Sequence, residues 1–164
     1  MKRALTLKSK QGLERVLITP IEVYKASEDE FVSTKAIWDT GATGSAITRT
    51  IVDKLNLVPT GMAIVATASG EKRMNTYTVD ILLPKVVVIK GIVATEVDAL
   101  ASDCDALIGM DIITLGDFSI TNLRGYTCMS FRIPSSHEID YVKSPDYGLV
   151  ELEPSSSKKK KKKA

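Results

Sequence analysis

Cysteine, histidine and long apolar runs are scarce in this chain, and each scarcity excludes a class of protein. Two cysteines and one histidine among 164 residues argue against a disulfide framework, a zinc site or a Ser-His-Asp triad. No apolar run approaches the roughly 20 residues of a membrane-spanning helix, and the basic N-terminus lacks the apolar core of a secretion signal. We therefore expect a cytoplasmic protein that needs no metal ion or other cofactor.

The net charge of +2 conceals an uneven distribution. Six of the 22 basic residues form the run 158–163, so that 16 basic residues stand against 20 acidic ones elsewhere. A nucleic-acid-binding domain spreads Lys and Arg over one face, and we expect no specific nucleic-acid partner here. Residues 154–164, rich in serine and lysine, are predicted to be a disordered tail. Residues 1–153 are long enough for one domain with its own core.

Short strands separated by turn residues dominate the remaining pattern. Helical periodicity is limited to residues 48–55 and 111–115. Such a pattern predicts an all-β fold, either a sandwich or a closed barrel, with one or two short helices. The predicted strands are residues 16–24, 31–38, 62–68, 75–83, 86–89, 92–97, 118–121 and 126–133, with turns at 69–72, 90–91 and 122–125.

One segment carries a candidate for chemistry. An apolar strand ending at Trp38 leads into Asp39-Thr40-Gly41, which places a single carboxylate in a loop of small residues. Gly41 and Gly44 permit close backbone approach, and the Thr40 hydroxyl can bridge to another backbone. A phosphate-binding loop is the competing interpretation, but neither G-x-x-x-x-G-K-[ST] nor G-x-G-x-x-G is present.

Two further elements follow in a characteristic order. A hairpin contains Ser69-Gly70, and the apolar segment Leu107-Ile108-Gly109 lies downstream of it. Combined with Asp39-Thr40-Gly41-Ala42, this arrangement resembles the retropepsin-like aspartic proteases over roughly residues 16–134. The resemblance implies a closed β-barrel with a flap hairpin that covers the substrate. It also implies the catalytic carboxylate Asp39, loop support by Thr40, Gly41, Leu107, Ile108 and Gly109, and substrate contact by Ala42, Ser69 and Gly70.

The chain contains Asp-Thr-Gly only once. Hydrolysis by carboxylates requires one group to accept a proton from water and another to donate one. The second carboxylate must then be Asp39 of another copy, with the active-site loop and a terminal strand such as residues 126–133 building the homodimer interface. The predicted function is an aspartic endopeptidase acting on peptides or proteins. The alternatives are a catalytically silent peptide-binding or scaffolding module, and an unrelated β-domain tethered to anionic surfaces by its tail.

Overall fold

The computed structural model describes residues 3–67, 70–85, 87–101 and 103–143. The predicted boundary at residues 153/154 and the tail lie outside this part. The elements within it are β1 (Arg3–Lys8), β2 (Leu17–Lys25), β3 (Phe31–Trp38), β4 (Ala46–Thr48), α1 (Arg49–Lys54), β5 (Gly61–Thr67), β6 (Gly70–Leu83), β7 (Val87–Val97), β8 (Ala106–Ile108), α2 (Met110–Ile113), β9 (Asp117–Thr121), η1 (Leu123–Gly125), β10 (Cys128–Ile133) and η2 (Tyr141–Lys143).

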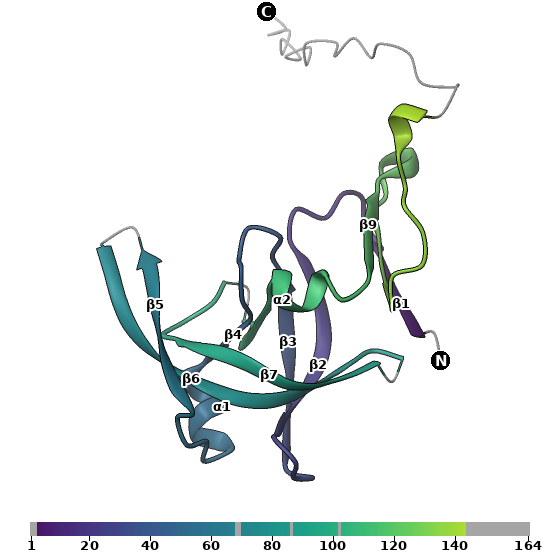
Figure 1. Cartoon of the computed structure of the whole chain (residues 1–164). Coiled ribbons are helices and arrows are strands. Elements are labelled where there is room, and N and C mark those ends of the chain that lie inside the picture. Colours follow the sequence, from purple (N-terminus) through teal and green to yellow (C-terminus); the bar gives the residue numbers. More distant parts are fainter. Residues whose placement is uncertain (1–2, 68–69, 86, 102, 144–164) are drawn as a thin grey trace, which may run out of the picture.

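Six strands close into a barrel in the order β2-β3-β8-β4-β7-β6 (Figure 1). Closure results from a second pairing of β2: Leu17–Tyr24 pair with β3, and Glu22–Lys25 pair with β6. Apolar residues from several of these strands, among them Val23, Val79 and Ile108, are fully buried in the core. The prediction of an all-β closed barrel with one or two short helices is confirmed.

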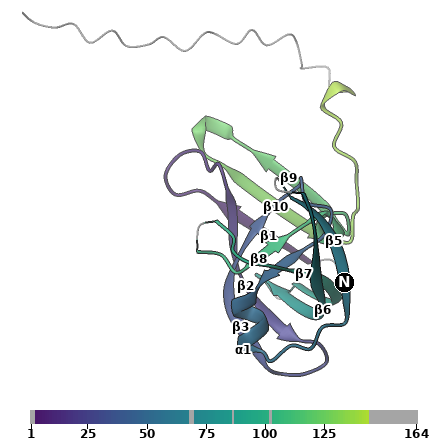
Figure 2. The same ribbon diagram turned by 90° about the vertical axis from the view of Figure 1, so that its left-hand side faces the viewer.

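A separate three-stranded sheet, in the order β1-β10-β9, packs beside the barrel (Figure 2). The Trp38 ring stacks on Phe118 of β9 at a centroid distance of 5.5 Å and contacts Phe131 of β10 at 5.2 Å. The strand that delivers Asp39 is therefore fixed against this sheet. β10 lies in the middle of this sheet, paired with β1 on one edge and with β9 on the other.

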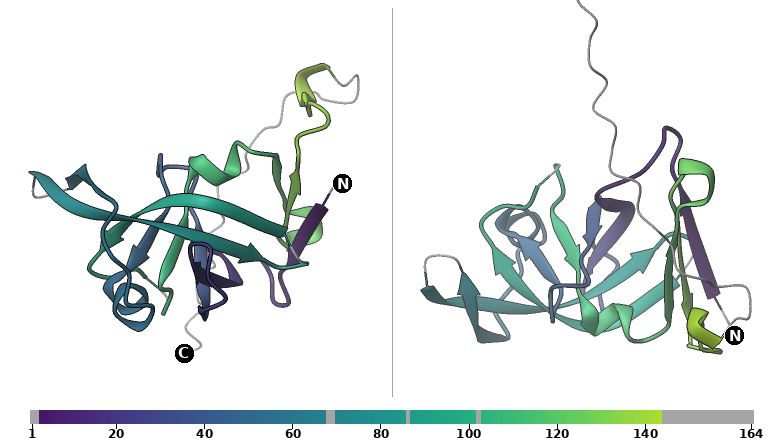
Figure 3. Two further views of the ribbon diagram at one scale, coloured as in Figure 1. Left: turned by 60° about the horizontal axis from the view of Figure 1, so that its bottom comes forward. Right: turned by 90° about the horizontal axis from the view of Figure 1, so that it is seen from above.

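The flap hairpin is formed by β5 and β6 and projects from the barrel in each view (Figure 3). The pairing runs from Gly61↔Thr76 to Thr67↔Gly70. Glu71 and Lys72, which were predicted as turn residues, are instead paired within β6, which begins at Gly70. Ser69, the other residue expected at the flap tip, lies outside the described residues.

The predicted turn at residues 90–91 is instead a bend inside one strand, β7. Gly91 has a φ of +68°, a conformation that favours glycine, and its N–H donates to Asp80 Oδ1 at 2.7 Å. The partner strand β6 shifts register between Val79 and Ile81. A bulge in the ladder therefore accommodates the glycine, and pairing continues on both sides of it.

Both predicted helices are present as α1 and α2, and the first buries Ile51 and Val52 against the barrel.

Neither β1 nor β4 was predicted. In β1, inward-facing Leu5 and half-buried Leu7 alternate with exposed residues over only six positions, which is a weak signal. In the part of the chain that is described, no helix has the length and apolar character needed to cross a membrane.

Candidate active site

Asp39 directly follows the C-terminal end of β3. Its backbone is fixed there, and its side chain is partly accessible. The Asp39 N–H donates to Ile108 O at 3.0 Å, and Asp39 Oδ1 accepts the Gly41 N–H at 2.8 Å. A Cβ at Gly41 would lie 3.2 Å from that same oxygen. The tight Asp-Thr-Gly turn thus holds the half-buried carboxylate in one orientation.

The Leu-Ile-Gly segment, to which the resemblance assigns support of this loop, is in direct backbone contact with it. Ile108 is fully buried, and Gly109 lies against the loop so closely that a Cβ there would be 2.5 Å from the carbonyl carbon and oxygen of Gly44. The Met110 N–H donates to Ala42 O at 2.8 Å. The segment after β8 therefore supports the active-site loop from behind.

Asp111 is a site residue that the sequence did not single out. Its Oδ2 accepts the Ser45 N–H at 3.0 Å, and its Oδ1 accepts the Ser45 hydroxyl at 2.8 Å. The Gly109 N–H in turn donates to Ser45 Oγ at 3.1 Å. These bonds close a small polar network around Ser45, which is only 1% exposed. Asp111 and Ser45 are far apart in sequence, so no local pattern indicates the contact.

A groove of about 610 Å³ opens between the active-site loop and β5 of the flap. Ala42 and Leu107 both line it; the resemblance places Ala42 beside the substrate. All of its lining residues are uncharged. Thr40 is exposed, whereas Gly70, at the start of β6 with a φ of +112°, is not among the residues that line the groove.

A buried acidic group supports the groove from the core side of β7. Glu96 is 3% exposed, and its carboxylate accepts the Tyr77 hydroxyl at 2.8 Å and bonds to the Arg49 guanidinium. Burial and the hydrogen bond to Glu96 raise the pKa of Tyr77. Thr95 and Val97, on either side of Glu96, line the groove. Among the described residues, no group of three or more His, Cys, Asp or Glu is placed to hold a metal ion.

A closed β-barrel that holds an Asp-Thr-Gly loop against a Leu-Ile-Gly segment has the architecture of a retropepsin-like aspartic protease. In agreement, residues 30–114 match the sequence model of the family described as "gag-polyprotein putative aspartyl protease". The match covers about half of the chain, and the chain belongs to this family. A search of curated proteins finds no match.

The solved structures that are similar to this chain include three proteases. A retropepsin-like aspartic protease from Rickettsia conorii is 16% identical, with a TM-score of 0.48 over 80% of this chain and 95% of the other. The EIAV protease in complex with the inhibitor HBY-793 is 19% identical, with a TM-score of 0.49 over 64% and 91%. The simian foamy virus (mac) protease is 18% identical, with a TM-score of 0.41 over 58% and 89%.

Proposed function

We propose that this protein is an aspartic endopeptidase whose catalytic carboxylate is Asp39. One observation carries the proposal: a single, partly accessible carboxylate accepts the Gly41 N–H, and its residue is fixed by a backbone bond to Ile108 O, at the edge of an uncharged groove. The groove lies between the active-site loop and a flap strand. Its shape and lack of charge suit a peptide in extended conformation with uncharged side chains.

The reaction divides between two carboxyl groups. An ionised carboxylate accepts a proton from water, which attacks the peptide carbonyl carbon, while a protonated carboxyl donates its proton to the carbonyl oxygen. Two carboxyl groups held a few ångströms apart share one proton, because both cannot be ionised together at that distance. The pair therefore supplies the base and the acid in the same site.

The second carboxylate is Asp39 of a second copy in a homodimer. The chain holds no other Asp-Thr-Gly, and a two-fold axis beside this loop would bring two identical carboxylates together. Thr40 is exposed in the single chain, which leaves its hydroxyl accessible to the partner's loop. The dimer thus completes a site of which each protomer holds half.

The flap offers the substrate a backbone partner. β5 is the last strand in the order β2-β3-β8-β4-β7-β6-β5, so its outer edge can pair with an extended peptide. Residues Ala63, Ile64 and Val65 of this strand line the groove. A peptide bound there would have its backbone held by β5 and its scissile bond close to the active-site loop.

The test compares the protein with Asp39→Asn in the digestion of a denatured protein mixture at mildly acidic pH. The amide keeps the size of the side chain but cannot exchange the proton, so we expect a loss of activity on the order of 10³-fold. Asp53→Asn, which changes an exposed aspartate on α1, is the matched control and should keep full activity. Activity of Asp39→Asn close to that of the unmodified protein contradicts the assignment.

A further inference from the structure

The flap leaves the barrel at Thr76 of β6. Residues of β6 up to Thr76 pair with β5 in the flap, and residues from Thr76 onward pair with β7 in the barrel. Thr76 itself lies between Gly61 of β5 and Thr95 of β7. The direction in which β6 passes through this position therefore decides where the flap stands over the groove (Figure 3).

A polar network holds β6 at this position from the core side. The hydroxyl of Tyr77, which follows Thr76 and is 3% exposed, donates to Glu96 Oε2 at 2.8 Å. Asn75, which precedes Thr76, donates from Nδ2 to the Tyr77 hydroxyl at 3.5 Å. The other Glu96 oxygen bonds to the guanidinium of Arg49, the first residue of α1. The network thus ties β6 to β7 and to the helix at the point where the flap begins.

Stability alone does not account for a carboxylate in this place. Glu96 lies opposite Ile47 of β4, and both side chains are almost completely buried. Burying a charged pair costs desolvation, and well-packed apolar side chains of similar volume are often as stable or more so. A hydrogen bond adds direction, because it weakens steeply when donor and acceptor leave their alignment. The bond to Glu96 therefore fixes the orientation of Tyr77 more closely than apolar packing would.

The groove has one wall on each side of this network. Thr95 and Val97, the neighbours of Glu96 on β7, line it from the barrel. Ala63 and Val65 of β5 line it from the flap. A change in the angle between β6 and β7 alters the spacing of these two walls, and the binding of a peptide between them changes with it.

We propose that Glu96 is a positioning residue of the groove, which holds β6 through Tyr77 and so sets the distance between the flap and the active-site loop. The inference rests on the proposed function and adds to it a residue on the core side of β7. Loss of the network should weaken peptide binding and leave Asp39, which is held by other bonds, in place.

The first experiment replaces the bond with an apolar pair of similar volume. Tyr77→Phe combined with Glu96→Leu leaves no buried hydroxyl or charge without a partner, so we expect the melting temperature to stay near that of the unmodified protein. The substrate is a fluorogenic peptide built on a cleavage site found in the digest of denatured protein. KM should rise roughly three- to tenfold, with kcat little changed. Tyr77→Phe alone should raise KM in the same direction, and Glu96→Gln, which keeps an acceptor oxygen for the Tyr77 hydroxyl, should retain most of the affinity.

A second tyrosine–glutamate pair provides the matched control. The Tyr24 hydroxyl donates to Glu22 Oε2 at 2.6 Å within β2, a strand that takes no part in the flap. Tyr24→Phe combined with Glu22→Leu should leave KM unchanged. An unchanged KM in folded Tyr77→Phe protein, with or without Glu96→Leu, overturns the inference, and so does an equal rise in KM in the control.

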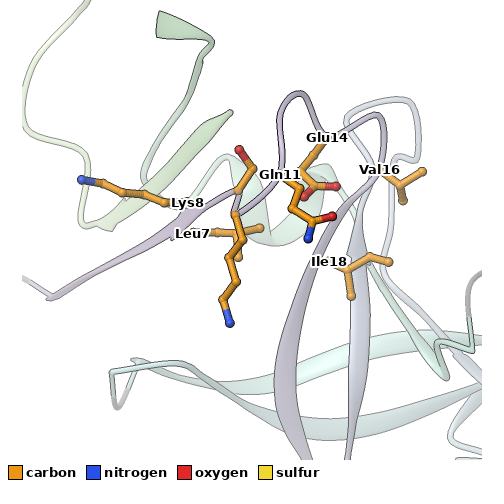
Figure 4. A pocket seen from close by; sticks show the side chains of 8 residues that line it. Leu7, Lys8, Gln11, Glu14, Val16 and Ile18 are labelled. Atoms are coloured by element: carbon orange, nitrogen blue, oxygen red, sulfur yellow. The ribbon is translucent and has the colours of Figure 1, made fainter. Parts of the chain in front are cut away.

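The second experiment needs no hydrolysis. Hydrogen–deuterium exchange in the full chain reports local opening of backbone hydrogen bonds, and it is followed in the flap strands at residues 61–67 and 70–75. Exchange there should become several-fold faster when Tyr77→Phe and Glu96→Leu are combined. The reference is the loop of residues 9–16, beside the recess between β1 and β2 (Figure 4). This loop is anchored to the β9–β10 hairpin, because the Glu14 N–H donates to Thr127 Oγ1 at 2.9 Å, and its exchange should not change.

The exchange result separates this inference from the proposed function. Faster exchange confined to the flap supports the positioning role of Glu96 even if the unmodified protein cuts no peptide, in which case only the proposed function fails. Unchanged exchange in the flap, or an equal acceleration in the flap and in the reference loop, overturns the inference.

Discussion

Gly109 lies against Gly44 so closely that only a residue without a side chain fits. A Cβ on Gly109 would come within 2.5 Å of the Gly44 carbonyl and 3.0 Å of the Ser45 nitrogen, whereas a Cβ on Gly44 would meet nothing within 4 Å. The contact is therefore asymmetric: there is no room for a side chain at Gly109, behind the active-site loop, whereas there is room for one at Gly44, within the loop.

This asymmetry predicts opposite outcomes for two alanine substitutions. Gly109→Ala forces backbone apart, and we expect a loss of unfolding free energy of about 1–3 kcal/mol or more, together with reduced activity because the loop that holds Asp39 is displaced. Gly44→Ala should leave the stability unchanged or slightly raised. Thermal unfolding of both variants checks the pair. A Gly109→Ala protein as stable as Gly44→Ala contradicts the packing described here.

Asp111 is predicted to act on the reaction through the position of the loop. Asp111→Ala leaves the buried Ser45 N–H and hydroxyl without their acceptor, which costs about 1–3 kcal/mol, and we expect kcat to fall more than KM rises. Asp111→Asn keeps one acceptor oxygen and the side-chain volume, so it should recover part of kcat. Steady-state kinetics of the three proteins provide the measurement. Equal kcat in all of them would show that the network has no bearing on the reaction.

A shared active site predicts that inactive protein inhibits active protein. Mixing Asp39→Asn with the unmodified chain produces mixed dimers with one catalytic carboxylate. Once subunits have exchanged, the activity per unmodified chain should therefore decline in proportion to the share of Asp39→Asn in the mixture. The specific activity of the unmodified protein should also fall on dilution. Albumin, added in place of Asp39→Asn, is the control. If Asp39→Asn lowers the activity no more than albumin does, and the active protein sediments as a monomer, the dimer mechanism is ruled out.

The Asp117 carboxylate predicts a pH dependence of stability. The Ser135 hydroxyl, the Arg132 guanidinium and the Ser136 N–H bond to it, and these contacts hold its pKa well below the ordinary value of 3.8. Because the pKa is depressed in the folded state, the stabilisation is complete above pH 3.8 and is lost as the pH falls through the lower folded value.

Asp117→Asn should therefore melt at a lower temperature than the unmodified protein near neutral pH, and the difference should shrink in strongly acidic solution. Thermal unfolding across the pH range measures this, with Asp53→Asn as the exposed control. A difference in melting temperature that stays constant down to the most acidic solution would mean that the contacts of Asp117 do not favour its ionised form.

Local pattern was sufficient for much of the fold. The strand 31–38 was predicted with the bounds that β3 has, because its apolar end and acidic turn are both local signals. The prediction of a turn at 90–91 was wrong, because a glycine after a lysine looks the same in a turn and in a bulge. Only the register shift of the opposite strand at Val79/Ile81 distinguishes the two.

The parts of the candidate site that consist of residues adjacent in the sequence were predictable. The parts that form when residues distant in the sequence come together in the fold were not. Asp39, Gly41 and Gly109 follow from a motif and its spacing. The bond from Ser45 to Asp111 joins residues 66 positions apart, and the groove brings Ala42 of the loop together with Val65 of β5. Both depend on how the barrel closes, which periodicity does not specify.

The pairing of β1 with β10 has a consequence for the order of events during synthesis. Arg3 lies opposite Ile133, so β1 cannot pair until β10, more than a hundred residues later in the chain, has been synthesised. Contacts so distant in sequence form slowly. Trp38, next to Asp39, packs on that late sheet through Phe118 and Phe131. A nascent chain therefore carries the Asp-Thr-Gly loop before the sheet that supports it can form, so the loop reaches its final packing only after β10 has been translated.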